Sequence, residues 1–339
     1  MLAPIVLFAY NRPIHLQQTI KSLIANPLSK KSHLFIYADG IKENATIESK
    51  QAVSKVQDYI QSLKSLNTTQ KFFNSITIKH AKHNLGLADS IINGTSEIMH
   101  QFGRAIILED DIVTSPVFLD YMNASLEQYK NKHKVWSISG WSYPIEVSGL
   151  GDCYFWRIPH CWGWASWNDR WIHFKRDTSW ALKNFDKKDI DYINLDGVAR
   201  YFEHLIANHQ GKIKTWAIFN YLISYKHSAL TLCPNISYIK QIGFDGSGIH
   251  CGKEGNIYNP THINIKFPIT YPHKIIESHL ALERIKAFEQ SIRKPLHTRA
   301  YSKMLNLSSI FTQKAKKLMG GGAELKYFYT QYHNLRKAA

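Results

Sequence analysis

The sequence has little cysteine, no long apolar segment and fewer acidic than basic residues. Four cysteines in 339 residues are too few for a disulfide scaffold. None of them forms a CxxC pair, which argues against a zinc ribbon or a thioredoxin-like site. No run approaches the roughly 18 apolar residues of a membrane-spanning helix, and the first residues lack the basic region of a secretory signal. We therefore expect reduced thiols and a cytoplasmic location.

The charge balance points to an anionic partner. Lys and Arg number 42 against 26 Asp and Glu, a formal net charge of +16. Such an excess suits nucleic acid, nucleotide phosphates or an anionic membrane. The basic residues are dispersed, and no helix-turn-helix, RRM or zinc-finger signature occurs, so we expect no nucleic acid as partner.

The first 140 residues alternate between short apolar runs and segments with helical periodicity. This alternation predicts an α/β fold with a mostly parallel sheet and helices on both faces. Beyond residue 140 the pattern changes: a strand is expected over Tyr154–Ile158, an aromatic-rich helix over Gly163–Trp171, and a glycine-rich loop over Gly243–Gly248. The apolar runs of the first part cover residues 5–10, 34–38, 76–78, 105–108 and 135–139.

Three adjacent carboxylates, Glu109, Asp110 and Asp111, follow the fourth apolar run. Like charges in a row repel one another, and a cation would relieve that repulsion. Carboxylate oxygens suit Mg²⁺ or Mn²⁺, which often take one or two protein carboxylates plus substrate phosphates. The alternative is a structural one, in which the acidic residues favour the start of the following helix.

Other polar residues stand where neighbouring strands are expected to end, and ligands of open parallel sheets bind at that edge. Arg12 is either a surface arginine or a partner of a nucleotide phosphate or base. Asp39 either belongs to an Asp-Gly turn or accepts hydrogen bonds from a base or ribose. Gly86 lies at a strand-to-helix junction, where backbone can approach a ligand.

The segment 156–167 holds four of the nine tryptophans. Aromatic rings there either stack on sugars or form a core beneath a loop. Trp162 and Trp164 are our candidates for an acceptor site. His250 follows the glycine-rich loop and is either a late metal ligand or phosphate contact, or a structural or solvated histidine.

The ordered set of motifs resembles nucleotide-sugar transferases with the GT-A fold, a Rossmann-like sheet. The similarity is greatest to the N-acetylglucosaminyltransferase-I-like group and its bacterial relatives in surface-polysaccharide synthesis. It covers about residues 3 to 255. The motifs that carry it are Pro4–Pro13, Asp39-Gly40, Asn84-Leu85-Gly86, Leu108–Asp111 and Ile242–Cys251.

This resemblance implies a site for a UDP-sugar and a divalent cation, with a DXD-like role for the acidic triplet. Asp111 would coordinate Mn²⁺ or Mg²⁺, while Glu109 and Asp110 would contact the ribose and sugar of the donor. Arg12 and Asp39 would contact the nucleotide. From their positions alone, Gly86 is a candidate for donor binding and His250 a candidate further metal ligand. The transfer would invert the sugar, a carboxylate taking the proton of the acceptor hydroxyl.

The catalytic base of the family is not found at its usual place. The matching stretch, Trp216–Phe219, has no carboxylate. Of the nearby acidic residues, Asp245 is our candidate, because a glycine-rich loop beside the sheet can reach the donor. The other options are Asp169, Asp196 and Glu203.

Three parts of the chain are expected. Residues 1–140 would bind the nucleotide sugar, and 141–294 would bind the acceptor and close the same GT-A unit. Residues 295–339 carry eight basic residues and one acidic residue, and form a basic helical appendage in this prediction. Such a tail suits either an anionic membrane or packing on the catalytic part. A membrane role would fit a saccharide or lipid-linked acceptor at the cytoplasmic face.

Overall fold

The apolar runs of the first 140 residues form strands of one sheet. The structure, a computed structural model, describes residues 1–246 and 255–292. The chain divides into a compact unit, Met1–Glu289, and a second unit, Gln290–Ala339. The tail predicted over 295–339 lies outside the described residues, as does His250. The strands from the runs are β1 (Ile5–Ala9), β2 (His33–Ala38), β3 (Ser75–His80), β4 (Arg104–Glu109) and β6 (Val135–Ser139).

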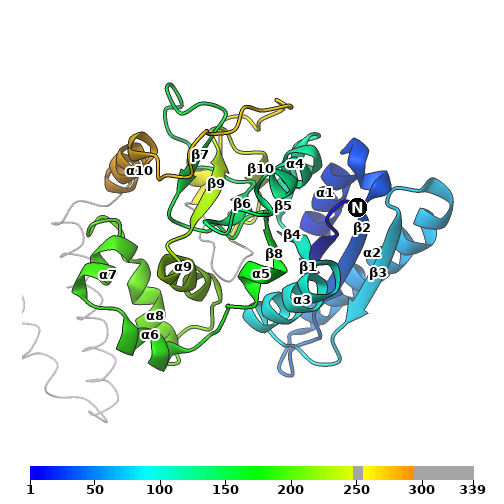
Figure 1. The fold of residues 1–339 in the computed structure, drawn as a ribbon. Helices are drawn as coiled ribbons and strands as arrows, with labels where there is room; N and C mark the ends of the chain where they lie inside the picture. The colour runs from blue at the N-terminus through cyan, green and yellow to red at the C-terminus, as the bar shows by residue number, and fades with distance from the viewer. Residues whose placement is uncertain (247–254, 293–339) are drawn as a thin grey trace, which may run out of the picture. The chain divides into compact units, whose positions relative to one another are not determined.

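The sheet has eight strands in the order β3-β2-β1-β4-β8-β6-β9-β7 (Figure 1). Three strands come from the second half of the first unit: β7 (Cys153–Trp156), β8 (Trp164–Trp167) and β9 (Leu230–Pro234). Four of the seven pairings are parallel, including the continuous set β3, β2, β1 and β4. The predicted α/β class with a mostly parallel sheet is therefore confirmed. Both halves contribute strands to this one sheet.

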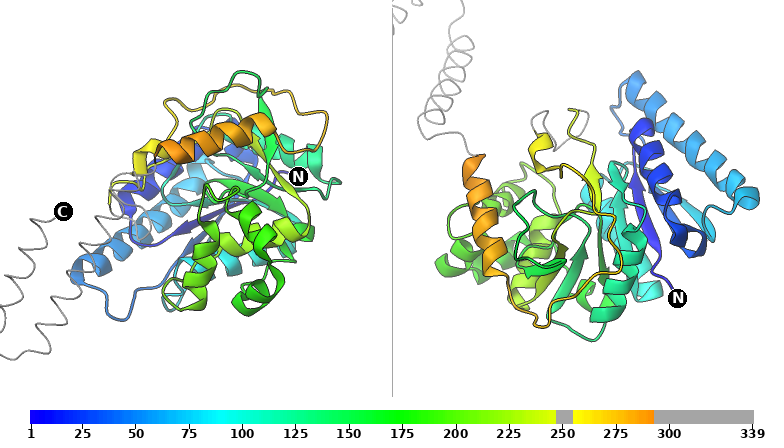
Figure 2. Two further views of the ribbon diagram at one scale, coloured as in Figure 1. Left: turned by 90° about the vertical axis from the view of Figure 1, so that its left-hand side faces the viewer. Right: turned by 90° about the horizontal axis from the view of Figure 1, so that it is seen from above.

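Alternating side chains of β1 face two different layers of helices. Ile5 and Leu7 pack into a core shared with α1 (Pro13–Ile24), α2 (Ile47–Gln70) and α4 (Phe118–Tyr129). Val6 and Phe8 pack into a second core with α3 (Leu87–Phe102). This division follows from the two-residue period of a strand, and it places helices on both faces of the sheet (Figure 2).

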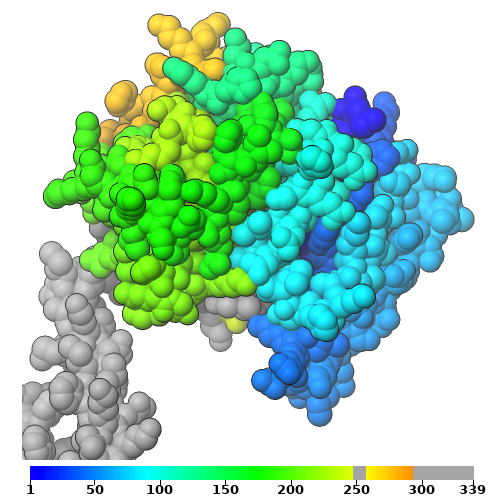
Figure 3. All heavy atoms as spheres, turned by 60° about the horizontal axis from the view of Figure 1, so that its bottom comes forward, coloured from blue at the N-terminus to red at the C-terminus, as the bar shows by residue number. Residues whose placement is uncertain are grey.

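The second half is built of short helices around β7 and β9. The first is α5 (Asn168–Trp171), where Trp171 Nε1 donates to Ser96 Oγ of α3 at 2.8 Å. Figure 3 shows α3, in cyan, against the green surface of this half. The remaining helices of this half are α6 (Thr178–Asn184), α7 (Lys187–Ile193), α8 (Tyr201–His209), α9 (Ala217–Lys226), η2 (Gly255–Tyr258) and α10 (His279–Ser291), while the short helix η1 (Pro27–Lys31) belongs to the first half.

The helix predicted over Gly163–Trp171 is wrong for its first part. Trp164–Trp167 is strand β8, inserted antiparallel between β4 and β6, and only Asn168–Trp171 is helical. All four residues of β8 are buried. A strand covered on both faces shows no alternation of polar and apolar residues, so its sequence resembles that of a buried helix.

A small second sheet connects the acidic triplet to the glycine-rich loop. β5 (Ile112–Thr114) follows the triplet directly and pairs antiparallel with β10 (Ile239–Gln241). The pairing continues into a hydrogen bond of 2.9 Å from Ile242 N to Asp111 O. Residues 242–246, far away in sequence, therefore lie beside the carboxyl end of β4. Among the described residues, no helix is both long enough and apolar enough to cross a membrane.

Candidate active site

The carboxyl ends of β1 and β4 bring Arg12 onto the acidic triplet. Arg12 is the N-cap residue of α1, directly before Pro13, and stands just past the end of β1. Its Nη1 lies 2.8 Å from Asp111 Oδ2, and its Nη2 pairs with Asp110 Oδ1. Both aspartates are only 3% exposed. One guanidinium thus bridges two buried carboxylates.

Further hydrogen bonds fix Asp110 but leave one oxygen of Asp111 without a partner. Tyr10 N donates to Asp110 Oδ2 at 3.3 Å, and Thr19 Oγ1 donates to the carbonyl of Asp110 at 2.8 Å. Asp111 Oδ1 is buried and has no hydrogen-bond partner within the described part of the chain. A buried carboxylate oxygen in this state is costly, and a bound cation would satisfy it.

The charges of this site are strongly perturbed by burial. Burial, followed by repulsion from Asp111 and Asp110, raises the pKa of Glu109 to about 8. Burial also raises the pKa of Asp110, to about 6, against the opposing attraction of Arg12. For Arg12, burial acts to lower the pKa, but the two aspartates outweigh it and raise it. Perturbed groups gathered at one strand edge are typical of functional sites.

Gly243 of the glycine-rich loop packs directly against the ion pair of Arg12 and Asp111. A Cβ atom at this position would lie 2.3 Å from Asp111 Oδ2 and 2.9 Å from Arg12 Nη1. Its amide donates to Gln241 Oε1, and Gln241 is itself buried. Glycine is therefore required here for close approach of the backbone to the ion pair.

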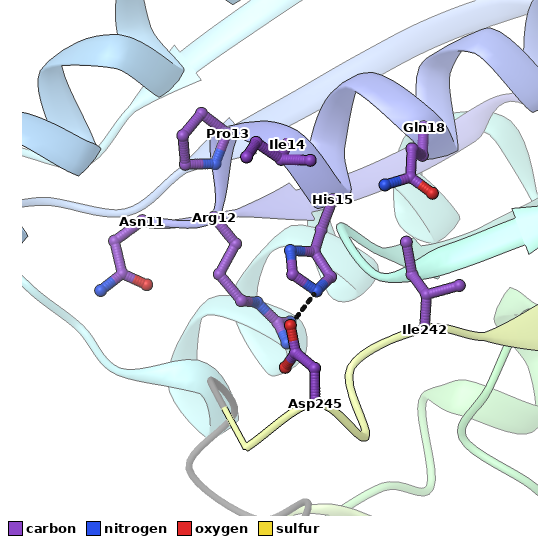
Figure 4. A pocket seen from close by; sticks show the side chains of 8 residues that line it. All are labelled: Asn11, Arg12, Pro13, Ile14, His15, Gln18, Ile242 and Asp245. Carbon is purple, nitrogen blue, oxygen red and sulfur yellow. Dashed lines mark ion pairs between the residues drawn. The ribbon is translucent and has the colours of Figure 1, made fainter. Parts of the chain in front are cut away.

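A pocket of about 430 Å³ opens next to Arg12, between the start of α1 and the loop after β10. Asp245 lies across it from His15, with His15 Nε2 3.1 Å from Asp245 Oδ2 (Figure 4). The pocket combines one cation, a carboxylate with its imidazole and two amides. Its lining residues are Asn11, Arg12, Pro13, Ile14, His15, Gln18, Ile242 and Asp245.

The other carboxylates considered as base lie elsewhere, in ion pairs of the second half. Asp169 pairs with Arg170, Asp196 with Lys286 and Glu203 with Arg200. None of these three lines the pocket. Asp245 is the one of the four predicted candidates that does, which keeps it as our candidate for the base.

Asp39 lies near the same edge but is engaged in joining two loops. Its Oδ1 accepts from the amides of Gly40 and Leu85, both at 2.8 Å. Its Oδ2 accepts from Gly86 N at 2.9 Å and Asn84 Nδ2 at 3.0 Å. The turn interpretation of Asp39 thus has direct support, while its contact with a nucleotide stays a prediction. Gly86 precedes α3 with a φ of 78°, a conformation that favours glycine.

The two acceptor candidates are placed very differently. Trp164 is 1% exposed and stacks on Trp216, with ring centroids 5.4 Å apart, inside the second core. The prediction that Trp164 binds acceptor is contradicted, because its ring has no surface to offer. Trp162 is half-buried and meets Phe244 of the glycine-rich loop edge to face at 5.6 Å. Phe244 directly precedes Asp245 in the sequence, so Trp162 remains a candidate for the acceptor site.

The donor set fits a cation held mainly by its substrate. The described residues contain no cluster of three or more His, Cys, Asp or Glu side chains able to hold a metal unaided. Asp111 nevertheless presents an unpartnered buried oxygen, and Mg²⁺ and Mn²⁺ commonly take one or two carboxylates and complete their shell with phosphates and water. His250, the second metal candidate, lies outside the described residues.

Sequence reasoning missed His15 and Gln18 as pocket residues. They stand three residues apart on the first turns of α1, and side chains at that spacing share one helix face. Their polar character on the face next to Arg12 was the available signal. The pairing of β5 with β10 brings Ile242 and Asp245 to this face, and no local pattern in the sequence indicates that pairing.

Comparison with known proteins finds a match for the first 144 residues, which include Arg12 and the acidic triplet. Residues 1–144 match the model of the GNT-I family. Over 144 residues the chain is 28% identical to alpha-1,3-mannosyl-glycoprotein 2-beta-N-acetylglucosaminyltransferase of Arabidopsis thaliana. That alignment covers 41% of this chain and 31% of the relative, so the chain matches about a third of the relative's length. The predicted similarity to the N-acetylglucosaminyltransferase-I-like group is confirmed for this segment; the bacterial relatives stay a prediction.

Two solved structures are distant likenesses of this chain. UDP-glucose pyrophosphorylase complexed with UDP-glucose has a TM-score of 0.39 and 11% identity, covering 76% of this chain and 96% of that one. TarS of S. aureus has a TM-score of 0.28 and 14% identity, covering 44% and 23%. Similarities at these TM-scores carry no argument about this chain.

Proposed function

We propose that this chain is a metal-dependent, inverting glycosyltransferase that uses a UDP-sugar. The observation that carries the proposal is the group of Asp110, Asp111 and Arg12 at the ends of β4 and β1. It lies within the segment that matches the GNT-I family, and ligands of parallel sheets bind at this edge. The sugar is a hexose or an N-acetylhexosamine, and the acceptor a saccharide or a lipid-linked saccharide of surface-polysaccharide synthesis.

The acidic triplet would hold Mn²⁺ or Mg²⁺ together with the donor. Asp111 would contribute its free Oδ1, and Glu109 and Asp110 would contact the donor ribose and sugar. When bound, the cation offsets negative charge on the donor diphosphate, the leaving group. Arg12 supplies a second positive charge, suited to phosphate oxygens.

Asp245 would act as the general base toward the acceptor. Its carboxylate lines the pocket that Arg12 also lines, so a hydroxyl held there can reach both the base and the donor side. The proton would pass from the hydroxyl to Asp245 as the oxygen attacks the sugar in line with the departing diphosphate. His15, 3.1 Å from Asp245, fixes the direction of the carboxylate.

The test is a thermal-shift series with UDP, UDP-GlcNAc, UDP-GalNAc, UDP-galactose and UDP-glucose, each with and without Mn²⁺. Selective binding to the folded state at 100 times Kd stabilises by about 2.7 kcal/mol. ADP and GDP, each with Mn²⁺, serve as control ligands. We expect a rise in Tm for the uridine ligands in the presence of Mn²⁺ and none for these two controls. An equal response to all nucleotides, or none to UDP, would contradict the proposal.

A non-catalytic sugar-nucleotide-binding module is the second candidate. The stretch where the family carries its base begins α9, has no carboxylate, and places Trp216 and Phe219 in the core. Such a module would bind UDP with Mn²⁺ but would neither hydrolyse nor transfer the donor. Release of UDP from the donor, measured with and without saccharide acceptors, separates the two candidates.

Trp162 is proposed to face the acceptor. Its half-buried ring adjoins Phe244 of the loop that bears Asp245. We expect Trp162→Ala to raise the acceptor KM while UDP binding stays unchanged, and Trp162→Phe to behave more like the original chain. A general loss of stability would instead assign Trp162 to the core.

The basic tail, residues 295–339, is proposed to bring the enzyme to an anionic membrane, at the cytoplasmic face. Each basic residue near such a surface contributes about 1 kcal/mol, reduced by salt. The full chain should co-sediment with anionic but not neutral liposomes and release at high salt, whereas a chain ending at Lys294 should not bind. Equal behaviour of the two chains would contradict the membrane role.

A further inference from the structure

Arg12 already neutralises part of the charge of the carboxylates that would receive a cation. The guanidinium contacts Asp111 Oδ2 through Nη1 and Asp110 through Nη2, and its side chain is only 17% exposed. Two buried negative charges and one partly buried positive charge leave this trio with one net negative charge. A divalent ion arriving alone would meet that single charge and a fixed arginine beside it.

The two oxygens of Asp111 have different surroundings. Oδ2 is taken by Arg12 and covered by Gly243, because a Cβ at that glycine would lie 2.3 Å from it. Oδ1 is buried and has no hydrogen-bond partner among the described residues. Asp111 therefore has one oxygen satisfied by the arginine and another that can accept a ligand.

We infer that Arg12 acts as a resident counter-cation that makes binding of a divalent ion depend on a diphosphate. With no diphosphate present, Arg12 repels the ion from Asp111. A diphosphate supplies the missing negative charge, and its oxygens offer Arg12 an alternative partner of the kind that guanidinium groups bind well. Metal and nucleotide then enter as one unit. This inference deepens the proposed function and rests on its metal site.

The first test uses titration calorimetry to compare the Mn²⁺ affinity of the full chain with and without UDP. We expect weak binding of Mn²⁺ alone and binding at least about tenfold tighter with UDP, because opposite charges at contact distance attract strongly in a buried site. Mn²⁺ binding that is equally tight without UDP would overturn the inference. This comparison needs no variant.

The second test uses Arg12→Met and Mn²⁺ alone. Methionine keeps much of the side-chain bulk and removes the charge, so Mn²⁺ affinity should rise by about tenfold or more. Arg12→Lys retains a cation and should stay near the original chain. Arg104→Met, which removes a cation paired with Glu127 elsewhere, is the matched control. Unchanged Mn²⁺ affinity in Arg12→Met would refute the role of Arg12.

Two further measurements identify the site and guard against misfolding. Adding Asp111→Asn to Arg12→Met should remove the gained Mn²⁺ affinity; persistence would show binding elsewhere and overturn the inference. Because Arg12→Met leaves buried carboxylates unpaired, it should melt earlier, and Mn²⁺ should raise its Tm more than that of the original chain. An equal rise in both would contradict us. If UDP does not bind but Mn²⁺ alone still distinguishes Arg12→Met, the proposed donor fails while the role of Arg12 stands.

Discussion

Replacing Gly243 by alanine tests whether the glycine-rich loop is part of the acidic site. The added Cβ would lie 2.3 Å from Asp111 Oδ2, where real Cβ atoms essentially never come closer than 3.0 Å, so an atom must move by about 0.7 Å. On the other side stands Arg12 Nη1 at 2.9 Å, so the carboxylate and the guanidinium are both displaced. Overpacking of this kind costs about 1–3 kcal/mol.

We expect Gly243→Ala to remain folded but to bind UDP with Mn²⁺ about tenfold more weakly, equivalent to about 1.4 kcal/mol. Calorimetric titration gives the affinity, and urea unfolding gives the stability. The matched control is Gly197→Ala, between α7 and α8, where the φ of 82° makes alanine strained but no atom lies within 4 Å. That variant should lose stability and keep its UDP affinity. Unchanged affinity in Gly243→Ala would refute the close approach of the loop to Asp111.

Three other predictions follow from single residues. Asp111→Asn should abolish the Mn²⁺-dependent rise in Tm with UDP without unfolding the sheet, as a thermal-shift series would show. Arg170→Ala should lower the free energy of unfolding in urea by about 3 kcal/mol, because the buried guanidinium donates to the carbonyls of Tyr129 and Lys130 at the end of α4; a loss under about 1 kcal/mol would contradict this. Burial lowers the pKa of His160 from 6.5 to about 3. The stability that the neutral imidazole contributes is therefore complete above pH 6.5 and should be lost as the pH falls toward 3. The loss should reach up to about 1.4 kcal/mol per pH unit. Urea unfolding at pH 7 and pH 5 should show this loss in the original chain and less of it in His160→Asn.

The parallel half of the sheet was predictable from local sequence. β1, β2 and β4 are apolar runs that end in polar residues, and each is followed by a segment with helical period. Such strands and crossovers carry their own signal, because period and turn chemistry are local properties. Their carboxyl ends place Arg12 and the acidic triplet at one edge of the sheet, so the location of the candidate site was also predictable.

Strand β8 shows where local sequence fails. Trp164 and Trp167 belong to an antiparallel strand between β4 and β6, a pairing decided by residues far away in the chain. Both faces of this strand are covered, and its one polar residue, Ser166, is buried with its Oγ donating to the carbonyl of Trp136, so polarity does not mark its orientation. The same burial removed Trp164 from the acceptor site, since an aromatic ring in a sequence looks alike whether it lines a groove or fills a core.

The ion pair of Arg12 with Asp110 and Asp111 depends on both kinds of information. Local sequence places a cation and three carboxylates at the same strand edge, but it does not say whether the arginine faces a ligand or its own neighbours. The answer comes from β10, whose pairing with β5 lays Gly243 over the site and closes one side of it. With that side closed, Asp111 Oδ1 is buried without a hydrogen-bond partner among the described residues, and the pocket beside His15 opens next to Arg12. The long-range pairing of two three-residue strands therefore determines which atoms of the acidic triplet can do chemistry.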